Sequence, residues 1–229
     1  MQSYVIHFIR HGMTEANVNG QYAGAWDVPL CDEGIKKLNN LKSNYEYPKA
    51  QEYYSSSLSR CVDTCKILYG DVDIIKRDNL KECSFGDWEG KNTEFLLKDA
   101  AFKNWMSNND GMIAPPNGES NAEFAQRICM EFENIVNSMI KRGVKSSCIF
   151  THGGVIMMIL SMYGLPQADY YDWIVDNGCG YSIRITPSLW MRDKVVEVYS
   201  KVPEGSSGEI SGEFKNLIDT LSSEKGKEE

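Results

Sequence analysis

Short β-rich runs alternate with longer amphipathic stretches along most of this chain, and this alternation limits the fold more than any other feature. The β-rich runs lie at residues 4–9, 52–56, 147–151, 181–186 and 195–202. Stretches with apolar residues at helical spacing lie at residues 32–43, 58–68, 120–142 and 153–163. The order predicts βα units, so we expect an α/β fold with a largely parallel sheet.

The segment from Ser120 to Arg142 carries the strongest helix signals. Ser120 and Glu123 form an S-x-x-E capping box, and Gly143 follows as a stop. An apolar stripe runs between these ends and consists of Phe124, Ile128, Phe132, Ile135 and Met139. We therefore expect a long helix with one buried face. We expect Gly90 to Pro116, which precede it, to pack over one end of the sheet as a helical or loop insertion.

Charge and apolar patterning exclude several classes of partner. The chain has 229 residues with 24 basic and 32 acidic side chains, a net charge of −8, which argues against a general nucleic-acid or anionic-membrane binder. The longest uncharged apolar stretch, residues 153–165, is shorter than the ~20 residues that span a bilayer. No basic segment with a cleavage site opens the sequence, so we expect a cytoplasmic protein.

The cysteines and histidines do not have the spacing of a metal site. Seven cysteines are scattered without a C-x-x-C pair, and the three histidines form no H-x-H or H-x-x-x-H pair. We expect reduced, mostly buried thiols, no metal and no cofactor.

Composition changes after Val202. Residues 203–229 hold seven acids and three lysines, which gives this segment a charge of −4. We expect residues 1–202 to form the folded domain and residues 203–229 to form an acidic, mobile tail. An alternative is a short docked helix, because Phe214, Leu217, Ile218 and Leu221 have the spacing of one helical face.

Basic groups follow three of the predicted strands. Arg10-His11-Gly12 ends the first, Arg60 lies in the first helical turn after the second, and His152-Gly153-Gly154 ends the third. The carboxyl ends of parallel strands meet at one sheet edge, where α/β proteins bind ligands. Arginines, histidines and the N–H groups of a helix N-terminus suit an anion, and phosphate is the natural candidate.

These residues belong to a longer series of motifs. Residues 10–17 read R-H-G-M-T-E-A-N, residues 55–60 read S-S-S-L-S-R, and residues 151–154 read T-H-G-G. Between them come Gly24, Asp27, Pro29-Leu30 and Gly34, then Leu80-Lys81-Glu82, Phe85-Gly86-Asp87-Trp88-Glu89-Gly90 and Gly118-Glu119-Ser120. In this order the series resembles the histidine phosphatase superfamily, which includes the phosphoglycerate mutases, over residues 4–200. The resemblance implies a three-layer αβα sandwich of the phosphoglycerate mutase type.

The resemblance also implies roles for individual residues. His11 would accept the phosphoryl group on a ring nitrogen, and Glu82 would act as general acid and then as general base. The phosphoryl oxygens would be bound by Arg10, Arg60 and His152. Further phosphate contacts would come from Thr14, Asn17, Gly24 and the backbone of Gly153.

Alternatives remain for some of these residues. Asp87 and Glu89 lie near Glu82 in sequence and are rival candidates for the acid. His7 stands among apolar residues and is expected to be a neutral core histidine. Arg127, on the long helix, is expected to be solvated or ion-paired.

Three positions depart from the family pattern. Met13 stands where relatives carry a polar residue, Ser57 replaces a proline, and Cys31 replaces a helix-capping threonine. None of the three is a proposed catalytic residue, so these departures bear on the substrate more than on the reaction.

The resemblance favours a metal-independent phosphomonoesterase that acts on a small-molecule phosphate ester through a phosphohistidine. Phosphoglycerate mutases carry an L-x-G-L-N-K loop after the acid, whereas residues 85–90 here read F-G-D-W-E-G. This loop is similar to that of α-ribazole phosphatases and broad-specificity phosphatases. The alternatives are a phosphoglycerate mutase and a noncatalytic module that binds a phosphate ligand.

Overall fold

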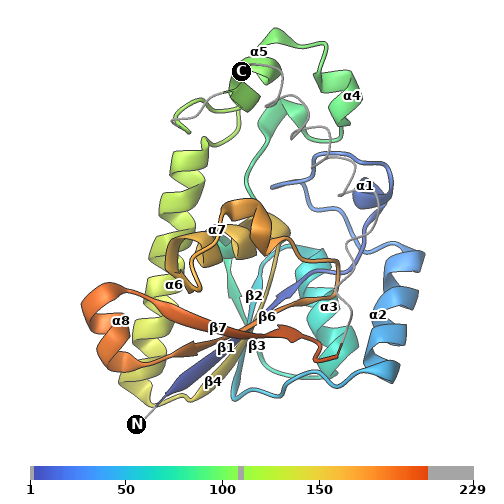
Figure 1. Cartoon of the computed structure of the whole chain (residues 1–229). Coiled ribbons are helices and arrows are strands. Elements are labelled where there is room, and N and C mark those ends of the chain that lie inside the picture. Colours follow the sequence, from blue (N-terminus) through green and yellow to red (C-terminus); the bar gives the residue numbers. More distant parts are fainter. Residues whose placement is uncertain (1–2, 108–110, 206–229) are drawn as a thin grey trace.

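One mixed sheet lies at the centre of the fold in the computed structural model, which describes residues 3–107 and 111–205 (Figure 1). In these residues the strand order is β3-β2-β4-β1-β6-β7-β5. The strands are β1 (Tyr4–Arg10), β2 (Glu52–Ser56), β3 (Ile74–Arg77), β4 (Ser146–Thr151), β5 (Gly164–Leu165), β6 (Gly180–Ile185) and β7 (Val196–Val202). Strands β3, β2, β4 and β1 are parallel, and β6 pairs antiparallel with β1 and with β7. The predicted mostly parallel sheet is confirmed.

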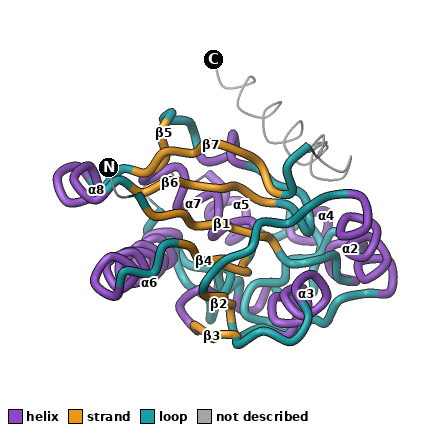
Figure 2. Tube along the Cα trace, turned by 90° about the horizontal axis from the view of Figure 1, so that it is seen from below, coloured by secondary structure: helices purple, strands orange, loops and turns teal. Residues whose placement is uncertain are grey.

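Helices cover both faces of this sheet, so the three-layer αβα arrangement is also confirmed (Figure 2). One face carries α2 (Asp32–Asn44) and α3 (Ser59–Tyr69), and the other carries α6 (Asn121–Arg142), α7 (Gly153–Tyr163) and α8 (Pro187–Asp193). Consecutive strand residues point to opposite faces. In β4, Cys148 and Phe150 pack with α2 and α3, whereas Ile149 packs with α6 and α7. Each face thus has its own core.

The long helix α6 follows its sequence signals closely. Ser120 Oγ accepts from the Glu123 N–H at 3.2 Å, and Glu123 Oε2 accepts from the Ser120 N–H at 2.8 Å. Gly143 ends the helix with φ +74°, in the left-handed region that glycine tolerates best. The predicted stripe from Phe124 to Met139 is buried. In α2, Leu38 is buried as its spacing predicts, but Ile35 of the same stripe is exposed.

The insertion between residues 90 and 116 lies beyond one end of the sheet, as expected (Figure 1). It contains α4 (Thr93–Leu96) and α5 (Ala100–Ser107). Their buried residues Leu96 and Phe102 form a small core with Trp88. This core is separate from those on the two faces of the sheet.

Strand β7 ends at Val202, and the chain is buried for one residue more. Val202 and Pro203 are both buried, whereas Glu204 and Gly205 are exposed. The division into a domain of residues 1–202 and a tail of residues 203–229 stays a prediction, because the structure describes only the first three residues of that tail. The predicted tail stripe, Phe214 to Leu221, lies outside the described residues.

The thiols are buried to the extent expected. All seven cysteines are free, six of them are buried, and Cys129 is half-buried.

Across residues 3–107 and 111–205, no helix has the length and hydropathy needed to cross a bilayer. Nor do His, Cys, Asp and Glu side chains in these ranges gather in threes around a point where a metal ion could be held.

Candidate active site

Three adjacent strands deliver the predicted site residues to one sheet edge. Arg10 is the last residue of β1 and is paired with Thr151 of β4, so the segments that follow these strands, with His11 and His152, lie side by side. The ring centroids of the two histidines are 5.1 Å apart. Strand β2 lies on the other side of β4 and leads into α3, whose second residue is Arg60. The structure thus brings Arg10, His11, Arg60 and His152 together, as the sequence predicts.

His11 is buried and held by its neighbour's backbone. Its Nδ1 lies 2.7 Å from the Gly12 carbonyl oxygen. Burial, with the positive charges of Arg60 and Arg10, holds the pKa of His11 well below its ordinary value. A neutral ring that donates from Nδ1 to this carbonyl leaves Nε2 unprotonated. His11 therefore presents a nucleophilic nitrogen.

Thr64 of α3 fixes the turn that carries His11. The Gly12 N–H donates to Thr64 Oγ1 at 2.8 Å, and Thr64 Oγ1 donates to the Arg60 carbonyl at 2.6 Å. A Cβ at Gly12 would lie 2.6 Å from Leu38 Cδ1, so a larger residue in this turn would have to displace the Leu38 side chain of α2. The turn and the first helical turn of α3 are therefore joined as one unit.

Neutral groups orient the two buried arginines. Arg60 donates to the carbonyls of Trp26 and Gly24, both at 2.7 Å, and to His152 Nδ1 at 3.4 Å. Arg10 donates from Nη1 to the Val175 carbonyl at 2.7 Å. Two guanidinium groups at one sheet edge favour an anion, and the charges of Asp176 and Glu82 offset part of the charge of Arg10.

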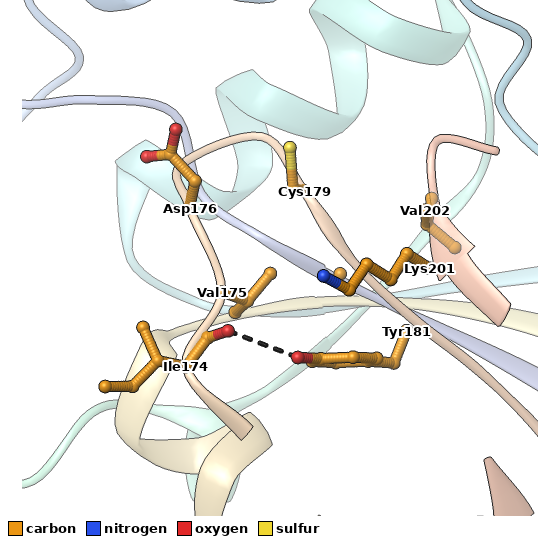
Figure 3. Close-up of a pocket in the computed structure, with 8 residues that line it drawn as sticks. Ile174, Val175, Asp176, Cys179, Tyr181, Lys201 and Val202 are labelled. Carbon is orange, nitrogen blue, oxygen red and sulfur yellow. Dashed lines mark hydrogen bonds between the residues drawn. The ribbon is translucent and has the colours of Figure 1, made fainter. Parts of the chain in front are cut away.

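Val175, whose carbonyl accepts from Arg10, belongs to the wall of a small pocket (Figure 3). In that wall, Tyr181 donates its hydroxyl to the Ile174 carbonyl at 3.2 Å. Asp176, also in the wall, forms an ion pair with Lys37 at 2.6 Å. The pocket wall thereby supports the backbone that orients the Arg10 guanidinium.

Glu82 is half-buried and reaches the N-terminus of α7. Its carboxylate accepts from the Gly154 N–H at 2.9 Å and from the Cys83 N–H at 3.0 Å. Burial raises the pKa of Glu82, and these hydrogen bonds and the two arginines only partly oppose the rise. A carboxyl group with a raised pKa beside an anion site is suited to donate a proton.

The two rival carboxylates are occupied elsewhere. Glu89 accepts from the N–H groups of Ala25, Trp26 and Phe85 at 2.9, 2.5 and 3.1 Å, and so ties two loops together. Asp87 is exposed and is bound by the Asn117 amide at 3.1 Å. This geometry favours Glu82 as the acid.

The residues expected to make further phosphate contacts border the same edge but also have structural partners. Thr14 caps the short helix α1 (Glu15–Val18), and its N–H and hydroxyl both donate to Asn17 Oδ1 at 3.1 Å. Gly24 supplies the carbonyl that orients Arg60, and a Cβ there would lie 1.6 Å from the Cys83 carbonyl oxygen. Gly153 begins α7 next to Arg10.

His7, by contrast, lies in the sheet core as expected. Its Nδ1 is 2.8 Å from Ser182 Oγ on the antiparallel neighbour β6. Burial lowers the pKa of His7 to about 4, so the ring is neutral at physiological pH.

Sequence reasoning missed two residues that position the site. Arg127 is ion-paired with Glu119, as expected, but it also donates to the carbonyls of Asn79 and Lys81 at 2.8 and 3.0 Å. It thereby clamps the loop that carries Glu82. Asn177 donates to the His11 carbonyl at 2.9 Å from the turn before β6. The D-N-G sequence of this turn, in which Gly178 has φ +79°, is the signal that could have drawn attention to Asn177.

Comparison with known proteins identifies the family to which the chain is similar. A profile of the histidine phosphatase superfamily (branch 1) matches residues 6–197. The chain is 30% identical over 190 residues to an adenosylcobalamin/alpha-ribazole phosphatase of Escherichia coli (strain K12). The matched region covers 77% of this chain and 88% of that protein. The chain is 32% identical over 173 residues to a phosphoglycerate mutase of Schizosaccharomyces pombe, which covers 68% and 78%.

Solved structures agree with this assignment. The crystal structure of a putative alpha-ribazole-5′-P phosphatase from Escherichia coli K-12 superimposes with a TM-score of 0.71 at 26% identity, covering 86% of this chain and 94% of that one. A phosphoglycerate mutase from Bacillus anthracis superimposes with a TM-score of 0.70 at 20% identity, covering 89% and 94%, and shares the fold.

Proposed function

Because the chain belongs to the histidine phosphatase superfamily (branch 1), we propose that it hydrolyses small phosphate monoesters through a phosphoryl group carried on His11. The observation that carries the proposal is the arrangement at the sheet edge. A neutral His11, with Nδ1 tied to a carbonyl, stands beside two buried arginines and beside a carboxyl group with a raised pKa. This set supplies a nucleophile, an anion site and an acid without a metal ion.

In the first step, His11 Nε2 attacks the phosphorus atom of the bound ester. The N–P bond forms as the ester P–O bond breaks, and Glu82 gives its proton to the departing alkoxide oxygen. Arg10 and Arg60 hold the phosphoryl oxygens, and His152 orients Arg60, because phosphoryl transfer depends chiefly on positioning and on fixed positive charge.

In the second step, water takes the place of the released alcohol. The Glu82 carboxylate accepts a proton from the water as its oxygen attacks phosphorus and the N–P bond breaks. The products are inorganic phosphate, a neutral His11 and a protonated Glu82, so the site returns to its starting state.

We propose α-ribazole 5′-phosphate as the first substrate to test, since relatives of the phosphatase type match the chain over most of their length. The F-G-D-W-E-G loop that follows Glu82 also favours a phosphatase. A phosphoglycerate mutase is the second candidate, because a mutase is 32% identical to the chain.

A phosphate-release panel tests these proposals. It contains α-ribazole 5′-phosphate, sugar phosphates, nucleotides, 3-phosphoglycerate and phosphopeptides, with the His11→Ala variant as the blank. Release above the blank is the expected result, and no release from any ester would contradict the phosphatase and favour a noncatalytic binding module. Conversion of 3-phosphoglycerate to its 2-isomer without phosphate release would instead establish a mutase.

A further inference from the structure

Both ring nitrogens of His152 are engaged inside the protein. Nε2 lies 2.9 Å from the Ser56 hydroxyl at the end of β2, and Nδ1 receives a hydrogen bond from Arg60 Nε at 3.4 Å. Ser56 and His152 have no solvent exposure, and Arg60 is 1% exposed. In such a place the hydrogen-bond partners decide which way the ring faces and which nitrogen carries the proton.

The donors and acceptors fit one assignment. Arg60 Nε can only donate, so His152 Nδ1 accepts and carries no proton. Burial, Arg60 and the other nearby cations keep the pKa of His152 well below its ordinary value, so the ring is neutral with a single proton. That proton is on Nε2 and is donated to Ser56 Oγ.

The Ser56 hydroxyl is itself held in one orientation. Its oxygen also accepts from the Leu58 N–H at 3.4 Å, so its own proton turns to Cys61, with which it shares a side-chain hydrogen bond. The Cys61 thiol donates to the Thr151 carbonyl at 3.5 Å and lies 3.5 Å from His152 Nε2. Ser56 and the Cys61 thiol therefore link the His152 ring to the Thr151 carbonyl of β4.

On the basis of the proposed function, we propose that Ser56 is a positioning residue for phosphoryl transfer. By accepting the Nε2 proton, Ser56 sets the tautomer and the plane of the His152 ring, so that Nδ1 is on the side of the Arg60 guanidinium. The ring then holds Arg60 through its Nε–H, and the Arg60 guanidinium meets the phosphoryl oxygens. Ser56 acts only through His152.

Nitrogen NMR of the wild-type protein tests the tautomer directly. With ¹⁵N-labelled histidine, the His152 ring should give a protonated Nε2 signal and an unprotonated Nδ1 signal. The Ser56→Ala variant should lose this single pattern, because Nε2 no longer has its acceptor. A wild-type ring protonated on Nδ1 would overturn the inference, whether or not the protein releases phosphate.

Kinetic measurements test whether the orientation of the His152 ring by Ser56 affects the reaction. In Ser56→Ala, kcat/KM should fall by about 10- to 100-fold, as for other residues that orient a ligand through hydrogen bonds, and the inhibition constant of vanadate should rise in parallel. The matched control is Ser55→Ala on the same strand, whose hydroxyl donates to the Ser56 carbonyl and is equally buried. It should stay within about threefold of wild type.

The outcomes separate the two proposals. Equal losses in both serine variants would mean a general effect of the strand and would overturn the role of Ser56. Full activity and vanadate affinity in a folded Ser56→Ala variant would overturn it as well. Failure of the wild-type protein to release phosphate from any ester would instead contradict the proposed function.

Discussion

A methyl group at Gly154 should disable the proposed acid without changing its chemistry. A Cβ built there would lie 2.4 Å from Glu82 Oε1, whereas ordinary contact begins near 3.4 Å, so the carboxylate has to move by about 1 Å. The move would also weaken the 2.9 Å hydrogen bond from the Gly154 N–H. Since Gly154 is the second residue of α7 and alanine favours a helix over glycine by about 1 kcal/mol, the variant should fold.

The size of the effect follows from that displacement. A misplacement of about 1 Å costs on the order of 10²-fold in rate, or about 2.7 kcal/mol of barrier. We expect Gly154→Ala to slow phosphoryl transfer from an alkyl phosphate by about this factor. Transfer from p-nitrophenyl phosphate should slow by less than about tenfold, because nitrophenolate leaves without a proton. Rapid-quench measurement of single-turnover rates gives both numbers.

Two other variants serve as comparisons for Gly154→Ala. Glu82→Gln should show the same dependence on the leaving group, with a loss of about 10²- to 10⁴-fold for the alkyl ester. Gly153→Ala places its Cβ 3.4 Å from Arg10 Nε, so any loss there should be equal for the two esters. Equal losses for both esters in Gly154→Ala would refute the reasoning and move the acid role to Asp87 or Glu89.

Four further expectations follow from the structure. Truncation after Gly205 should leave phosphate release within about threefold of wild type, because polar termini contribute little to a fold, and a larger loss would mean that residues 206–229 contribute to the site. Activity should persist in EDTA and be inhibited by vanadate, since guanidinium and N–H groups hold the anion; abolition by EDTA with rescue by a divalent cation would contradict this. The free energy of unfolding should fall as the pH drops from 6.5 to about 4, because in this range His7 is protonated in the unfolded chain but stays neutral in the folded protein. Urea titrations should show a smaller fall in the His7→Gln variant. Arg127→Leu should lower the free energy of unfolding by about 1–3 kcal/mol, measured in the same way, because it leaves the half-buried Glu119 and two loop carbonyls without their donor.

Local signals predicted the long elements of the fold but not the short ones. The α6 helix was predictable because its capping box, its stripe and its stop all lie within its own sequence. Strand β5 has only two residues, and β3 is a four-residue edge strand without a buried residue, so both exist through pairing with a neighbour. A single sequence carries little record of such pairing.

The same division holds at the site. Strand ends predicted that Arg10, Arg60 and His152 would meet, because parallel strands place their carboxyl ends together. The choice of Glu82 over Glu89 needed the resemblance, since Glu82 is separated by 72 residues from the Gly154 N–H that holds it. Side chains that orient others, such as Asn177, act across similarly long separations and leave only a turn signal in the sequence.

The small core of Trp88, Leu96 and Phe102 gives the insertion an internal support of its own. Among the described residues, no strand of the sheet contributes to this core, and Phe85 packs against both it and the larger core of α6 and α7. Substitutions in the insertion can therefore reshape the region above the sheet edge while the guanidinium and imidazole groups keep their places. In the proposed phosphatase, a new alcohol would therefore be accommodated by changes in the insertion, and the residues at the sheet edge that carry the proposed phosphoryl transfer could stay the same.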